Sequence, residues 1–167
     1  MSILLPGRQP PDTNEHPIYA RSGWEIPQKY LLPDDRILIR TRELTRWCPK
    51  AIVRSVSPYP YNCVGMIFAA RRAWIEIDHV YKILNEDGYR SIPFEAIIEG
   101  DIVLYEYNGS PAHVGVIMII DRSFGPNIRV LSKWGKDAEF IHFIENVPEQ
   151  LGKPTRYYTD RVPYEPS

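Results

Sequence analysis

The sequence has little cysteine and no long apolar run. Its 167 residues include two cysteines, Cys48 and Cys63, which do not make a disulfide framework, and we expect both thiols to be reduced. No apolar run approaches the length of a membrane span, and residues 1–5 are too short and lack the basic start of a secretory signal. We therefore expect a protein that uses no membrane and begins its life in the cytoplasm.

The sequence also lacks an excess of charge of either sign. The net charge is -1 and the isoelectric point is near 6.4, which excludes nucleic acid and anionic membranes as obligatory partners. The chain carries no phosphate loop, dinucleotide fingerprint or internal repeat. A zinc site built from Cys48, Cys63 and two of the four histidines lacks short ligand spacing, so we expect neither a metal nor a cofactor.

Proline is abundant by contrast. The 16 prolines concentrate at the two ends of the chain and just before Cys63. Residues 1–35 hold six of them and few periodic apolar positions, which predicts an irregular N-terminal arm. The remaining residues, 36–167, have the length of one domain and can bury a core without disulfides.

A thiol begins the best-defined predicted helix. The segment Tyr61-Asn62-Cys63-Val64-Gly65 leads into apolar residues at helical spacing, and Asn62 is a good N-cap. Cys63 is therefore predicted at the first helical position, where free N–H groups and the helix dipole lower a thiol pKa. The alternative is that Cys63 is simply a small, buried core residue.

The second half of the sequence predicts β-structure. Four candidate strands, joined by loops of hairpin length, predict an antiparallel meander that packs on the Cys63 helix. His113 begins the second strand, where it can face the start of the helix and serve as a general base to Cys63. The alternative is a strand-edge histidine satisfied by a neighbouring group. The candidate strands are residues 102–107, 113–120, 128–134 and 139–143.

Three motifs in order resemble a known family. Tyr61-Asn62-Cys63-Val64-Gly65, Gly100-Asp101-Ile102-Val103 and His113-Val114-Gly115-Val116-Ile117 are similar to the NlpC-type branch of the papain-like cysteine peptidases and amidases. In that branch the motifs read Tyr-Asp-Cys-Ser-Gly, Gly-Asp followed by two hydrophobic residues, and His-Val-Gly-Ile. The resemblance implies an α+β fold in which a nucleophile-bearing helix packs on an antiparallel β-meander.

The resemblance also implies roles for single residues. Cys63 is the implied nucleophile, His113 the implied base, and Tyr61 a group that helps to stabilise the oxyanion. The sequence departs from the family pattern at Asn62, where Asp is usual, and at Val64, where Ser is usual. Asn62 keeps the capping function, whereas Val64 removes a hydroxyl group that can matter for substrate fit.

A third catalytic residue is expected to orient His113. The family implies a His, Asn or Gln on the strand after the histidine strand, and residues 130–134 contain none of these. Ser132, Glu139 and His142 are the candidates. We choose His142 on chemical grounds, although strand register decides the outcome because a slip of one residue reverses the faces.

These features together predict a cysteine hydrolase that cleaves an amide or peptide bond through an acyl-thioester on Cys63. The family's usual substrate is the peptide stem of bacterial peptidoglycan, which a cytoplasmic chain reaches by lysis or a specialised secretion route. Deamidation, protein cleavage or acyl transfer inside the cell uses the same chemistry. The alternative function is a catalytically inactive papain-like domain that binds a peptide or protein partner. The sequence holds no amphipathic heptad or self-complementary strand that would indicate an oligomer.

Overall fold

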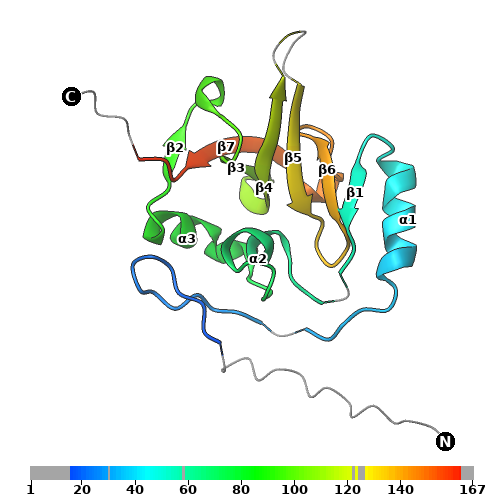
Figure 1. Ribbon diagram of the computed structural model, residues 1–167, viewed down its shortest axis with the longest axis horizontal. Helices are drawn as coiled ribbons and strands as arrows, with labels where there is room; N and C mark the ends of the chain where they lie inside the picture. Colours follow the sequence, from blue (N-terminus) through cyan, green and yellow to red (C-terminus); the bar gives the residue numbers. More distant parts are fainter. Residues whose placement is uncertain (1–15, 30, 58, 122, 124–126, 163–167) are drawn as a thin grey trace, which may run out of the picture.

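The fold is α+β, with three α-helices and a seven-stranded antiparallel sheet (Figure 1). The computed structural model describes residues 16–29, 31–57, 59–121, 123 and 127–162, and these statements refer to that part of the chain. None of its helices has both the length and the apolar character needed to cross a membrane. The helices are α1 (Ile37–Trp47), α2 (Cys63–Phe68) and α3 (Val80–Glu86). The strands are β1 (Ile52–Ser55), β2 (Arg90–Ile92), β3 (Ile102–Tyr107), β4 (Ser110–Asp121), β5 (Asn127–Lys133), β6 (Glu139–Phe143) and β7 (Lys153–Thr159).

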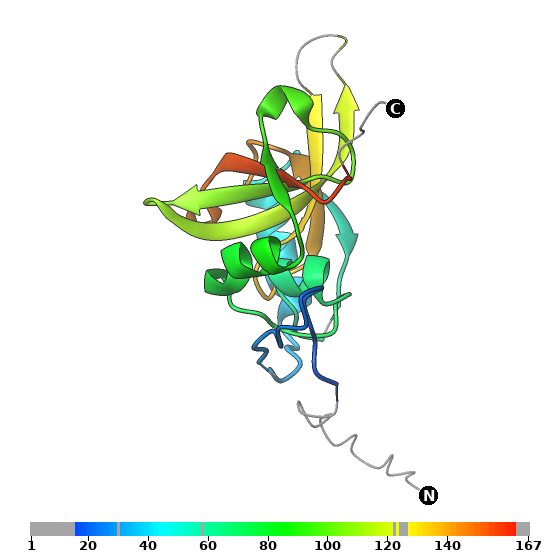
Figure 2. The same cartoon turned by 90° about the vertical axis from the view of Figure 1, so that its left-hand side faces the viewer.

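The strand order is β1-β6-β5-β4-β3-β7-β2. Strands β3 to β6 form the predicted meander, because each pairs antiparallel with the next along the chain. The C-terminal strand β7 pairs with both β3 and β2, although its sequence gives no clear strand pattern. The sheet is strongly twisted, and Figure 2 shows β3 and β7 turned steeply relative to β5.

Both faces of the sheet are covered. Val114 and Leu104 lie in the core that contains Cys63, beneath α2 and α3. Their neighbours along the strands, Val103 and Tyr105, belong to a separate core on the opposite face. Because side chains alternate between the faces of a strand, adjacent residues in β3 and β4 face different cores.

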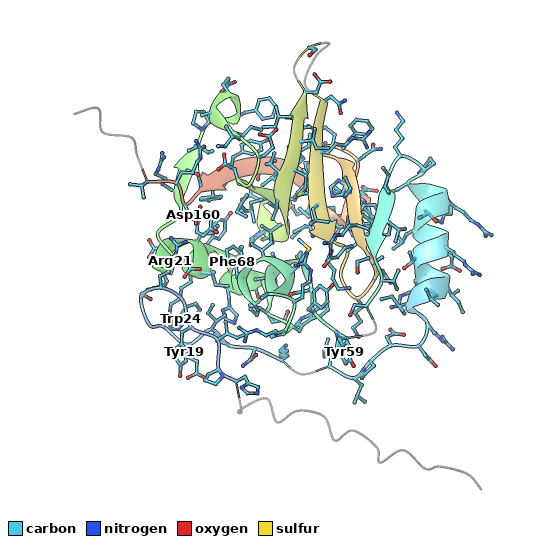
Figure 3. The ribbon with its side chains drawn as sticks, viewed as in Figure 1. Tyr19, Arg21, Trp24, Tyr59, Phe68 and Asp160 are labelled. Carbon is cyan, nitrogen blue, oxygen red and sulfur yellow. The ribbon has the colours of Figure 1, made fainter. Side chains whose placement is uncertain are left out.

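The described part of the N-terminal arm is packed onto the domain. Ile18, Ala20 and Ile26 are buried in the same core as Cys63. Arg21 reaches Asp160 beyond the end of β7, with 2.7 Å between guanidinium and carboxylate, and both residues are labelled in Figure 3. Residues 1–15 of the predicted arm lie outside the described residues. Residues 16–29 therefore contribute side chains to the core of the domain.

Candidate functional site

Cys63 occupies the first position of α2, as the sequence predicts. The Asn62 side chain caps the helix: its Oδ1 accepts from the backbone N–H of Gly65 at 3.0 Å. Oδ1 also accepts from the backbone N–H of Ile75 at 3.3 Å, and Nδ2 donates to the Ile75 carbonyl at 2.6 Å. A carboxylate at position 62 lacks this last donor. The amide therefore fits this site better than the Asp that is usual in the resembling family.

Helix α2 ends at Phe68, several residues before the apolar run does. Ala70 and Arg71 then adopt left-handed backbone conformations with φ of 47° and 65°, which are uncommon for residues with a side chain. The backbone N–H of Arg71 donates to the Gly65 carbonyl at 3.0 Å. This turn directs the Arg71 guanidinium towards Glu139 on β6, where its Nε donates to a carboxylate oxygen at 2.6 Å.

The thiol of Cys63 is enclosed and protonated at neutral pH. Its residue is 5% exposed, and this burial raises the pKa of Cys63 to about 11. The backbone N–H groups of Val114, Val64 and Cys63 itself interact with the sulfur and lower the pKa in part. These main-chain groups oppose the rise in the Cys63 pKa only in part, and desolvation keeps the proton in place.

Next to Tyr61, two residues before Cys63, lies a buried carboxylate with several donors. Glu139 is 1% exposed and accepts from the Tyr61 hydroxyl at 2.7 Å. Arg71 and Arg54 also donate to it, the latter at 2.8 Å. Burial would raise the pKa of Glu139, but these donors lower it overall, so the group is ionised. Because the Tyr61 proton is held by Glu139, an oxyanion role for Tyr61 requires that bond to open.

Lys133 completes this polar group. It lies opposite Glu139 in the β5–β6 register, and its ammonium stands 4.6 Å above the centre of the Tyr61 ring. Its Nζ donates to the backbone carbonyl of Asp137. Burial lowers the pKa of Lys133 to about 8, and the nearby Asp137 and Glu139 oppose that shift. Cys63, Tyr61, Lys133 and Glu139 thus form one polar cluster, which we call the thiol cluster.

His113 faces the other core. Its partner across the β3–β4 pair is Tyr105, and the centres of the two rings are 5.3 Å apart. Tyr105 belongs to the core opposite Cys63, whereas Val114, the neighbour of His113, packs with Cys63. Neither ring nitrogen of His113 has a hydrogen-bond partner among the described residues. Burial, followed by the charge of His142, lowers the pKa of His113 to about 3.

His142 lies on the same face as His113. Its Nδ1 donates to the Phe143 carbonyl at 2.9 Å, which leaves Nε2 to accept from the Ser132 hydroxyl at 2.8 Å. The Ser132 oxygen in turn accepts from the Trp134 indole at 3.1 Å. Burial lowers the pKa of His142 to about 4. Both ring nitrogens of His142 are therefore used in this network, and neither is directed at His113.

The predicted site residues are thus brought together in two separate groups. Cys63 and Tyr61 share one face of the sheet with Glu139, and His113 and His142 share the other with Ser132. No hydrogen bond joins Cys63 to His113. The four expected strands are present, but His113 does not begin its strand, because β4 starts three residues earlier at Ser110. The side chains of the expected nucleophile and base point to opposite sides of the sheet.

Sequence reasoning did not identify Lys133 or Arg71 as site residues. A signal for Lys133 was present, because a lone charge within the apolar strand residues 130–134 indicates a buried cation. Arg71 gave no such signal, since its position depends on the left-handed turn after α2.

The described residues hold no group of three or more His, Cys, Asp or Glu side chains placed to bind one metal ion. Comparison of the chain with models of known protein families, with curated proteins and with solved structures finds no match. Functional proposals therefore depend on the geometry of the thiol cluster and on the resemblance of the motifs.

Proposed function

We propose that the chain is a cysteine hydrolase of the papain-like, NlpC type, which cleaves an amide or peptide bond through an acyl-thioester on Cys63. The observation that carries the proposal is the place of Cys63, which begins the capped helix α2 and packs in one core with Val114 of β4. The helix cap and the sheet therefore fix the position of the thiol from two sides.

The surroundings of Cys63 add support. Two consecutive left-handed residues, Ala70 and Arg71, hold a guanidinium over Glu139, and strained backbone of this kind clusters at functional sites. The buried Lys133 and Glu139 each have a shifted pKa, which is also typical of such sites. The burial of Cys63 implies that substrate binding must open its surroundings before attack.

The first substrate class to test is the peptide stem of bacterial cell wall, because the three motifs stand in the order of the NlpC-type branch. Side-chain amides of proteins are the second class, since deamidation proceeds through the same acyl-thioester. Product analysis distinguishes the two substrate classes. Cleavage of a peptide stem releases a new amine, whereas deamidation of a protein side chain releases ammonia.

The test of the hydrolase is acylation by p-nitrophenyl acetate, followed by mass spectrometry of the peptide that contains Cys63. We expect one acetyl group on Cys63, lost again with time in water, and no acetylation in Cys63→Ala. A Cys48→Ser variant serves as the control and should behave like the parent. A parent protein that never carries an acyl group on Cys63 would overturn the proposal.

A second candidate function is a catalytically inactive papain-like domain that binds a peptide or protein partner. It is favoured by one specific observation: His113 faces away from Cys63, so the expected thiol–imidazole pair is not formed. The pKa of about 11 also keeps the thiol in its unreactive form.

Iodoacetamide labelling separates the two candidates. A structural Cys63 should remain unlabelled in the native Cys48→Ser protein at pH 8 and become labelled only in urea. A catalytic Cys63 should be labelled without urea, because the site must open transiently to admit a substrate.

A further inference from the structure

Lys133 is the one lysine or arginine among the described residues that is fully buried. It is 1% exposed and lies on β5, on the face of the sheet that Cys63 shares. Its Nζ is held between the Asp137 carbonyl and the face of the Tyr61 ring. A carbonyl and an aromatic face orient an ammonium group but do not neutralise its charge.

The carboxylates near Lys133 are used by other cations. Asp137 pairs with Arg40 through its Oδ1 at 2.5 Å. Glu139 pairs with Arg54 and Arg71, and it also accepts the Tyr61 hydroxyl. No ion pair joins Lys133 to a carboxylate within the described part of the chain. The buried amine therefore makes no direct ion pair, and Asp137 and Glu139 act on it only from a distance.

Lys133 on β5 lies near Cys63 at the start of α2. The register that pairs Val116 with Leu131, continued by two residues, places Lys133 beside Val114, which packs in the same core as Cys63. A charge on Lys133 lowers the pKa of Cys63, and a charge on Cys63 raises that of Lys133. Tyr61, two residues before Cys63, covers the ammonium.

A buried lysine without a direct ion pair is costly to the fold, and an apolar side chain of similar size is often more stable in its place. A buried lysine is also the form of this residue that serves as a general base in enzymes. We infer that Lys133, on the face that Cys63 occupies, is the base that removes the thiol proton of Cys63. This inference rests on the proposed hydrolase function.

The proton and electron balance is complete with these groups. The S–H bond of Cys63 breaks, the proton moves to the lone pair of neutral Lys133 Nζ, and the thiolate attacks the carbonyl carbon. The ammonium then gives its proton to the leaving amine as the C–N bond breaks, which leaves the acyl-thioester and a neutral lysine. Water is deprotonated by the same amine as it attacks the thioester, and the thiol proton is restored when the acid departs.

The experiment measures the pH profile of Cys63 acetylation by p-nitrophenyl acetate in the full chain with Cys48→Ser. In the parent we expect the rate to rise with pH through about 8, where Lys133 becomes neutral. Lys133→Met should remove this rise and slow acetylation by about a hundredfold, within the range of general-base effects. Lys133→Arg keeps the charge but accepts no proton, so it should be equally slow. Lys136→Met, at an exposed lysine of the following loop, is the matched control and should leave the profile unchanged.

Thermal unfolding of each variant checks that the measured rates belong to folded protein. If Lys133→Met does not fold, Lys133→Gln is measured in its place. An unchanged profile in folded Lys133→Met or Lys133→Gln would overturn the role of Lys133 while the hydrolase proposal stands. Loss of the rise at pH 8 in His113→Phe, but not in the Lys133 variants, would also overturn it. Absence of any acetylation of Cys63 in the parent would overturn both the inference and the proposed function.

Discussion

At the scale of single residues, His113 is the most unusual side chain. It is fully buried, its two ring nitrogens lack partners among the described residues, and its nearest ring is that of Tyr105. An unpaired buried polar group costs stability, and the neutral ring costs less than the charged one. Because burial disfavours the charged ring, the pKa of His113 falls to about 3.

The first prediction concerns acid stability and His113→Phe. The pKa of His113 lies below its ordinary 6.5 in the folded chain, so the unfolded chain takes up a proton first as the pH falls. The neutral ring makes its full contribution to the stability of the fold above pH 6.5, and this contribution is lost as the pH falls towards about 3. We expect His113→Phe to be within about 1 kcal/mol of the parent at pH 7 and to become more stable than the parent at pH 4.

Urea unfolding at both pH values measures this difference. His16→Ala, at an exposed histidine, is the control and should follow the parent. Equal pH dependence in His113→Phe and the parent would contradict the burial of a neutral imidazole at position 113.

The second prediction concerns Glu139→Gln. Glutamine keeps the size of the side chain but removes the charge that holds Tyr61, Arg54 and Arg71. Charge-assisted hydrogen bonds contribute more than neutral ones, so we expect a loss of about 2 kcal/mol of unfolding free energy. Urea unfolding at pH 7 measures it, with the exposed Glu149→Gln as the control. A variant as stable as the parent would show that the Glu139 charge does not hold the thiol cluster together.

At the scale of elements, α2 depends on groups outside itself. It has only six residues, and a helix this short does not form without external support. Asn62 ties its start to Ile75, and Gly65 lets the chain after the helix pass close, since a Cβ there would lie 1.8 Å from the Ala73 carbonyl oxygen. The position of Cys63 is therefore fixed by the segment that follows the helix.

The third prediction concerns Asn62. Asn62→Ala removes the cap and both bonds to Ile75, so we expect a loss of about 2 kcal/mol. Asn62→Asp keeps the acceptor but places a carboxylate against the Ile75 carbonyl, so its stability should fall between the two. Thermal unfolding at pH 7 ranks the three proteins. An Asp variant as stable as the parent would mean that the Nδ2 donor contributes nothing.

At the scale of the whole molecule, one core joins the arm, α2, α3 and the sheet. Ile18 and Ile26 of the arm pack with Cys63, with Ile83 of α3 and with Leu104 of β3. A backbone bridge from Lys29 to Trp74 adds a further connection. Segments that share one buried core are expected to unfold together.

The fourth prediction concerns Ile26→Ala, which removes a side chain that is 2% exposed. Cavity formation should cost about 2 to 4 kcal/mol and lower the midpoint of one concerted transition for the whole molecule. The control is Tyr19→Ala, which changes an arm side chain that is 56% exposed and labelled in Figure 3. An early, separate transition for residues 16–29 in hydrogen exchange would show that the arm does not belong to the common core.

Much of this architecture was predicted from local pattern. The Asn62 cap, the helix at Cys63, the four strands of the meander and their order along the chain all appear in the structure. Strand β7 was not predicted, because its own sequence has no clear strand pattern and its pairing with β3 holds it in the sheet. The early end of α2 was also missed, since the left-handed turn at Ala70 and Arg71 is held by contacts to Gly65 and Glu139.

The sequence by itself determined the helix start at Cys63 and the four strands of the meander, and it placed His113 on the second of these strands. The tertiary structure decided which face each side chain occupies. The physical reason is that both faces of this sheet are covered, so β3 reads as a continuous buried run, Ile102 to Tyr105, in which no polar alternation marks the side that α2 covers. Packing alone set Lys133 beside Cys63 and turned His113 away.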